Sequence, residues 1–284
     1  MPETIGNPLS WGARALGMAG HHVAESADRI GSHDTSVPRV QTLTMDDLGH
    51  ALAAGWEDFL ACRSDVMFLV LLYPVMGLVL MGIGFHMALI PLLFPLVMGF
   101  ALIGPVATVG VYELSRRRER GEETHWFTAL KVVERPSFGA IFVFGLYLAA
   151  LLVVWMLVAA EIYGATMGPA GPESLGAFVS AVLGTGEGWL LIIVGCGVGA
   201  VFAVVALAMS VVTVPLLLDR TPGLPVAVMT SVRVLQQNPV VILTWGVMVA
   251  GLLVLAAIPM LLGLVIALPV LGHATWHLYR RAVL

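Results

Sequence analysis

Six apolar stretches, each long enough to cross a lipid bilayer, constrain this chain more than any other feature of its sequence. A helix rises about 1.5 Å per residue, so about 20 apolar residues cross the hydrocarbon core of a membrane. The six stretches are Val66–Phe85, Leu89–Leu114, Phe138–Ala160, Trp189–Leu218, Val240–Ala257 and Ile258–Leu278. Inside a bilayer every backbone N–H and C=O needs a partner within the protein, and a helix supplies one for each. The sequence therefore predicts an all-α polytopic transmembrane bundle.

The composition excludes an ordinary soluble domain. Hydrophobic residues make up 59% of the chain and charged residues only 11%, whereas about 25% of the residues in a soluble domain are charged. An outer-membrane β-barrel is disfavoured, because its strands read as alternating segments of about ten residues and not as long continuous apolar runs.

The basic residues predict the orientation of the bundle in the membrane. All fourteen Lys and Arg residues precede the first stretch, follow the sixth, or fall between the second and third or the fourth and fifth. Basic residues are retained on the cytoplasmic side of a membrane. We therefore predict a multi-pass protein of the bacterial inner (cytoplasmic) membrane with cytoplasmic N- and C-termini.

The chain divides into two parts. Residues 1–40 are polar and rich in small residues, and we expect a mobile cytoplasmic extension; residues 41–284 form the six-span membrane domain. The membrane domain begins with a predicted interfacial helix, whose apolar face contains Leu48, Leu52, Trp56 and Phe59 at helical spacing.

The six spans are predicted to form three hairpins, each preceded by a cytoplasmic amphipathic helix. Two hairpin exits match closely, since Arg116 lies eleven positions after Pro105 and Arg280 lies eleven positions after Pro269. Three parallel repeats would explain the match, as would any set of hairpins that obeys the positive-inside rule. Glu113 and Asp219 occupy equivalent places at two exits, where we expect them to pair with neighbouring arginines.

Two histidines are the candidate metal ligands. His273 and His277 are four residues apart on the last predicted helix, so both imidazoles lie on one face and could bind a metal ion together. The alternative is that they cap backbone groups or bind lipid phosphate close to Arg280.

A further set of basic residues is predicted to orient the protein or to contact lipid headgroups. A basic side chain near an anionic membrane surface contributes about 1 kcal/mol. The set contains Arg116, Arg117, Arg118, Arg120, Arg280 and Arg281. The expected partners are thus membrane lipids and other integral membrane subunits, with no nucleic acid.

The sequence contains few residues suited to catalysis or ion transport. The middle of each predicted span lacks Asp, Glu, Lys and Arg, which argues against a proton-coupled pump. No phosphate-binding loop, nucleophile elbow or paired catalytic carboxylates occur. We predict no cofactor and no enzymatic activity.

Five motifs are distinctive: DDLGHALAAGW (46–56), GVYELSRRRERGE (110–122), VPLLLDR (214–220), TSVRVLQQNP (230–239) and LPVLGHATWHLYR (268–280). With these motifs the chain resembles a bacterial family of predicted integral membrane proteins of unknown function, some members of which are labelled cytochrome c oxidase subunit I-like. The resemblance extends from about residue 38 to the last residue. The oxidase label does not imply a catalytic role, because a catalytic oxidase subunit needs about twice as many spans and histidines on facing helices.

The leading functional hypothesis is a non-catalytic accessory or assembly subunit of a larger respiratory or photosynthetic membrane complex. Small-residue faces such as Gly195, Gly197 and Gly199 support it, because such faces allow close helix packing. The alternatives are a transporter or channel for a small solute, and a haem- or metal-binding membrane protein that uses His273 and His277.

Overall fold

The computed structural model describes residues 38–62, 82, 90–125, 129, 131–168, 171–220, 222–259 and 262–284. These residues are helical apart from turns, loops and one isolated β-bridge between Val40 and Val283. Residues 1–37 of the expected N-terminal extension fall outside the described residues. So does the first predicted span, Val66–Phe85, except for Gly82.

The described part of the chain contains four helical segments that are long and apolar enough to cross a membrane. They are Ile90–Glu119, Phe138–Met167, Gly186–Asp219 and Pro239–Ala257. The first comprises α3 (Ile90–Ala107) and α4 (Val109–Glu119), and the third comprises α8 (Gly186–Ser210) and α9 (Thr213–Asp219). Helices α6 (Phe138–Met167) and α11 (Pro239–Ala257) are the other two. They match the second to fifth predicted spans.

Helices α3, α6 and α8 pack around Trp155. A Cβ atom added to Gly99 on α3 or to Gly199 on α8 would lie 3.0 Å from the Trp155 ring. Glycine at both positions therefore favours this close approach of the two helices to the indole. The indole Nε1–H also donates a 3.0 Å hydrogen bond to the Pro95 carbonyl. Gly199, one of the small residues predicted to allow close helix packing, does so here.

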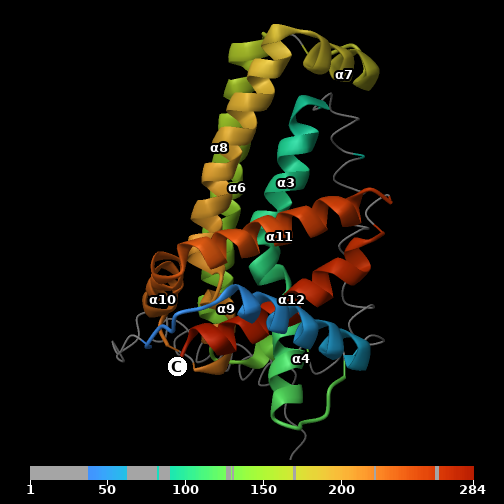
Figure 1. Cartoon of the computed structure of the whole chain (residues 1–284). Coiled ribbons are helices and arrows are strands. Elements are labelled where there is room, and N and C mark those ends of the chain that lie inside the picture. Colours follow the sequence, from blue (N-terminus) through green and yellow to red (C-terminus); the bar gives the residue numbers. More distant parts are fainter. Residues whose placement is uncertain are drawn as a thin grey trace, which may run out of the picture.

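One end of the bundle is closed by α7 (Leu175–Gly184), which joins α6 to α8 (Figure 1). The Ser174 hydroxyl caps α7 by accepting from the Ala177 N–H at 3.1 Å. The Thr185 hydroxyl caps α8 by accepting from the Gly188 N–H at 3.0 Å. These caps satisfy amides that a helix start leaves without a partner.

The opposite end, which we call the base, consists of residues 45–62, α4, α9, α10 (Leu224–Gln237) and the last turns of α12 (Leu264–Ala282) (Figure 1). Two of the three predicted amphipathic helices are present, as residues 45–62 and α10. Within the middle one the structure describes a short 3₁₀-helix, η1 (Lys131–Glu134), while residues 126–128 and 130 before it fall outside the described residues. Pro136 explains why η1 ends at Glu134, because the residue before a proline, Arg135, is disfavoured in the helical conformation.

Asn238 and the C-terminal residues hold the segment before the first described helix. The Asn238 Oδ1 accepts from the Leu43 N–H at 2.7 Å, and its Nδ2 donates to the Gln41 carbonyl at 2.9 Å. The Gln41 N–H also donates to the Ala282 carbonyl at 2.9 Å. The base is therefore closed by contacts between the two ends of the membrane domain.

The predicted sixth span, Ile258–Leu278, does not form one continuous helix. Helix α11 ends at Ala257, a turn follows, and α12 begins at Leu264. Helix α12 is not among the four candidate spans, because its C-terminal half contains His273, His277, Arg280 and Arg281. In Figure 1, α11 and α12 run across the direction of α6 and α8. Neither six spans nor three equivalent hairpins are therefore confirmed.

Candidate functional site

Glu113 is the centre of a buried ion-pair cluster at the base. Glu113, Arg116 and Arg117 share one face of α4, because residues three and four apart are neighbours on a helix. The Arg116 Nε and Nη2 donate to the two carboxylate oxygens at 2.8 and 2.9 Å, and the Arg117 Nε donates to Oε1 at 2.8 Å. Arg135, between η1 and α6, adds a 3.0 Å bond to Oε1. Glu113 is fully buried, so these donors replace the water that its charge would otherwise require.

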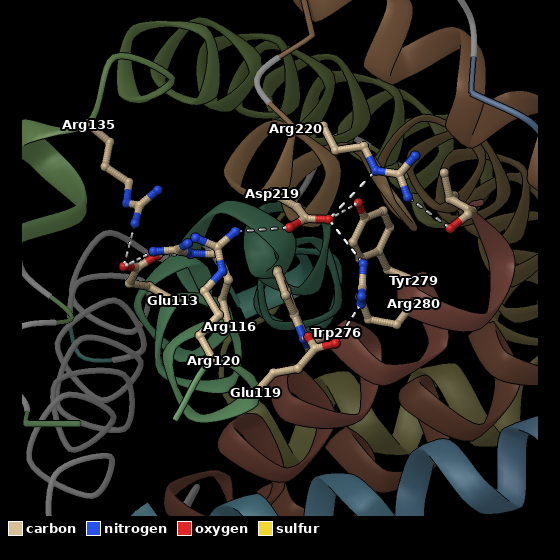
Figure 2. A network of polar contacts seen from close by, with 11 residues as sticks. Glu113, Arg116, Glu119, Arg120, Arg135, Asp219, Arg220, Trp276, Tyr279 and Arg280 are labelled. Carbon is tan, nitrogen blue, oxygen red and sulfur yellow. Dashed lines mark hydrogen bonds and ion pairs between the residues drawn. The ribbon is translucent and has the colours of Figure 1, made fainter. Parts of the chain in front are cut away.

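Asp219, the last residue of α9, is the second carboxylate centre (Figure 2). The Tyr279 hydroxyl donates to Oδ2 at 2.8 Å, and Arg280 donates to the same oxygen at 3.3 Å. Arg120 approaches Oδ1 to 3.6 Å. Burial, reinforced by the Asp219 charge, raises the pKa of Tyr279, so its hydroxyl stays protonated and acts as a donor. Asp219 therefore joins α9 to both α4 and α12.

Glu119 at the end of α4 makes a further contact with α12. It accepts a 3.1 Å bond from the Trp276 indole and a 2.9 Å bond from the Arg280 Nε. Figure 2 shows Arg280 between Glu119 and Asp219, so one guanidinium connects the two carboxylates. The expected pairing of Glu113 and Asp219 with arginines is confirmed, and Glu119 extends it.

A second polar cluster combines Asp58, Ser115, His273 and His277. The Ser115 hydroxyl donates to the Asp58 Oδ2 at 2.7 Å, and the His277 Nε2 lies 2.9 Å from the same oxygen. The Nδ1 of His273 lies 2.6 Å from the Ser115 Oγ. Burial alone would raise the pKa of Asp58, but the hydrogen bonds from His277 and Ser115 outweigh burial and lower it. The carboxylate is therefore the charged acceptor of the cluster.

Hydrogen-bond accounting fixes the tautomer of His273. The single hydroxyl proton of Ser115 goes to the Asp58 carboxylate, which can only accept. The Ser115 oxygen then accepts from Nδ1–H of His273, which leaves Nε2 as an unprotonated acceptor. That nitrogen is buried and has no partner among the described residues. A lone pair without a partner costs less here than a buried N–H without one, so the neutral imidazole is the consistent assignment.

The His277 Nε2 and the His273 Nδ1 both face the Asp58 Oδ2, at 2.9 and 3.7 Å, so the space between the two imidazoles is taken by the polar cluster. The Nε2 of His277 is engaged by Asp58, while the Nδ1 of His273 is engaged by Ser115. In the part of the chain that the structure describes, no three His, Cys, Asp or Glu residues form a metal-binding group. Metal binding by His273 and His277 stays a prediction, and the geometry describes instead a polar contact between residues 45–62, α4 and α12.

Each of the six arginines predicted to orient the protein or to contact headgroups has an acidic partner. Arg118 lies 3.1 Å from Asp58 and Arg281 lies 2.7 Å from Asp47. The other four contact Glu113, Glu119, Glu122 or Asp219. Such pairing is compatible with an orienting role, because the orientation of a membrane protein depends on the number of Lys and Arg residues near its spans and not on the net charge there. Headgroup binding stays a prediction.

The predicted interfacial helix is present as residues 45–62, with a different inner face from the one expected. Leu48 and Phe59 are buried and Leu52 is partly buried, but Trp56 is exposed. Asp58, a residue that would be expected on the polar face opposite Leu48, Leu52, Trp56 and Phe59, is buried against Ser115. Its spacing of three and four residues from Gly55 and Cys62, which are buried on the same face, was a signal of burial that the polar side chain concealed. That this helix lies at a membrane interface stays a prediction.

Together these contacts describe a polytopic integral membrane protein whose apolar helices rise from a base held by ion pairs. A family model described as "Predicted integral membrane protein (DUF2189)" matches residues 93–219. The matched region contains both carboxylate centres, Glu113 and Asp219, and ends before α10. Comparisons with curated proteins and with solved structures gave no match. The bacterial origin and the oxidase-like label expected from the resemblance form no part of this match.

Proposed function

We propose that the protein is a non-catalytic accessory or assembly subunit of a larger inner-membrane complex, with both termini on the cytoplasmic side. A respiratory or photosynthetic complex is favoured by the resemblance of the motifs to a family with oxidase-like labels. In such a subunit the base would act as a rigid support. Its ion pairs join α4, α9 and α12 in a fixed orientation, which non-directional apolar contacts alone would not provide.

The outward face of α8 is the observation on which this proposal depends. Only 6% of the most apolar 18-residue stretch of Gly186–Asp219 is buried against other parts of the chain. On this exposed face small residues alternate with large ones: Cys196, Gly197 and Ala200 lie beside Val201. A Cβ atom added to Gly197 would meet nothing within 4 Å.

Small residues on a membrane helix allow the backbone of a second helix to approach closely, whereas lipid chains gain nothing from them. We therefore infer that a transmembrane helix of a partner subunit packs on this face of α8. Buried polar side chains in the described residues all lie toward the base, which gives the transporter alternative no polar path through these spans.

The experiment uses Cys196, which is exposed on the proposed face, while Cys62 is buried. A photoactivatable crosslinker is attached to Cys196 in native membranes, and the adducts are identified by mass spectrometry. We expect one stoichiometric adduct with a membrane subunit that also co-purifies in mild detergent. As a control, Cys196 is replaced by Ala and the crosslinker is attached at Val247→Cys on α11, whose side chain is 72% exposed.

A pair of glycine variants tests the same face without a crosslinker. Gly197→Leu should abolish co-purification, and Gly164→Leu on α6 should not, although a Cβ at either glycine enters open space. If Cys196 gives lipid adducts only and the chain purifies alone, the accessory role is wrong.

A further inference from the structure

The α11–α12 hairpin contains a long stretch without any polar side chain. Residues 246–272 include neither a charged nor a hydrogen-bonding side chain, and the turn between the helices falls in the middle of them. The connection between α6 and α8 is different, since it contains Glu173, Ser174, Thr185 and Glu187. A turn that reaches water on the far side of a membrane needs such polar residues, and the hairpin turn has none.

The orientation of the hairpin agrees with its composition. In Figure 1, α11 crosses the direction of α6 and α8, and the turn after it lies well below α7, about level with the middle of α3. A Cβ atom added to Gly246, in the first half of α11, would lie 2.7 Å from Leu207 of α8. The start of α11 thus packs on α8 close to the base, and the remainder diverges from it.

Described residues on either side of the turn form backbone hydrogen bonds within the hairpin, as non-helical backbone at membrane depth requires. Leu262 N–H donates to the Pro259 carbonyl at 3.0 Å, and Ala267 N–H donates to the Gly263 carbonyl at 2.9 Å. A Cβ atom at Gly263 would lie 2.6 Å from the Ala256 carbonyl oxygen, so glycine allows α12 to begin directly against α11.

Both ends of the hairpin are fixed at the base. Asn238, which precedes α11, is bonded to the backbone of Leu43 and Gln41. Arg280 and Arg281 near the end of α12 are paired with acidic residues. Between these anchors the outward face of α11 is apolar and exposed at Val240, Leu243, Val247 and Val254, and so is Ile258 directly after it.

We propose that α11 and α12 form a re-entrant hairpin, which enters the membrane from the base and returns to it without reaching the far side. Its outward face contacts the acyl chains of the leaflet on the side of the base. Lipid chains are the fitting partner because the face has no polar side chain. The chain then has fewer crossings than six, while both its ends remain on one side.

Cysteine accessibility distinguishes a re-entrant hairpin from a spanning one. In a Cys196→Ala background, Cys62 is buried and its pKa is raised by burial, so it reacts little with maleimides. Ile258→Cys places a thiol at an exposed position near the tip, and Thr185→Cys places one on the far side as the matched control. Right-side-out and inverted vesicles are treated with a membrane-impermeant maleimide.

We expect Thr185→Cys to react in right-side-out vesicles and Ile258→Cys to react in neither preparation until detergent is added. Reaction of Ile258→Cys from the far side at the rate of Thr185→Cys would overturn the proposal. Leu262→Cys provides a second tip position if Ile258→Cys does not accumulate.

The depth of the tip is measured separately with a nitroxide attached to Ile258→Cys. For a lipid-facing re-entrant tip, collisions with oxygen exceed those with a water-soluble nickel chelate, and the spectrum shows a mobile label. A nitroxide at headgroup depth would indicate a spanning hairpin. A strongly immobilised label or dipolar broadening between chains would show that protein covers this face. Either result contradicts the proposal.

Discussion

Replacing Glu113 by Gln removes the charge on which three arginines converge, and it should destabilise the base more than any other single conservative change there. Glu113 is fully buried and the Arg116 side chain is 3% exposed. Breaking a buried ion pair by removing one partner costs about 3–5 kcal/mol, since the remaining charge is left without a counter-charge. Glutamine keeps one accepting oxygen, and Arg117 and Arg135 are partly solvated, so we expect about 3 kcal/mol.

The expected shift in melting temperature follows from this value. About 1 kcal/mol moves the midpoint of a domain of this size class by roughly 2–4 °C, so Glu113→Gln should melt about 6–12 °C lower. The assay heats the purified protein in mild detergent with a thiol-reactive fluorophore, in a Cys196→Ala background. Buried Cys62 is then the thiol that unfolding exposes.

Glu122→Gln is the matched control, because Glu122 is 42% exposed and lies 3.4 Å from Arg117. An exposed pair contributes about 0–1 kcal/mol, so the control should melt within about 4 °C of the parent. The double variant Glu113→Leu, Arg116→Met should recover part of the loss, since apolar residues in place of both charges remove the desolvation cost. Equal melting of Glu113→Gln and Glu122→Gln would refute the reasoning.

Three further predictions concern other parts of the base. Gly55→Ala should lower the melting temperature, because its Cβ would lie 2.5 Å from the Ala274 backbone nitrogen. Gly49→Ala on the same helix is the control: its Cβ would meet nothing within 4 Å, so the melting temperature should stay unchanged or rise slightly. Asn238→Ala loses two hydrogen bonds to the backbone of Leu43 and Gln41, about 2 kcal/mol, and should make residues 38–44 sensitive to limited proteolysis. Unchanged cleavage would show that Asn238 does not hold this segment. The pKa of Asp58 is lowered in the folded state, so its ionised form stabilises the fold at neutral pH. This stabilisation disappears as the pH falls through the folded-state pKa. The loss of stability with falling pH, followed by circular dichroism, should therefore be less steep in Asp58→Asn than in the parent.

The sequence by itself determined the features that depend on local composition. Hydropathy placed the four long apolar helical segments, because the free energy of transferring a residue into hydrocarbon depends mainly on that residue and its neighbours along the chain. The positions of Glu113 and Asp219 at two similar helix exits were sufficient to predict that both would pair with arginines.

Only the tertiary structure decided which distant residues meet and in which direction the last helices run. Asp58 and His277 are 219 positions apart, and no local pattern reports that their side chains bond. Hydropathy also cannot distinguish a helix that crosses the membrane from one that turns back inside it, since both need the same apolar surface. The direction of α11 and α12 follows instead from contacts at Gly246, Gly263 and Asn238, where close packing and directed hydrogen bonds act over a few ångströms between segments far apart in the chain.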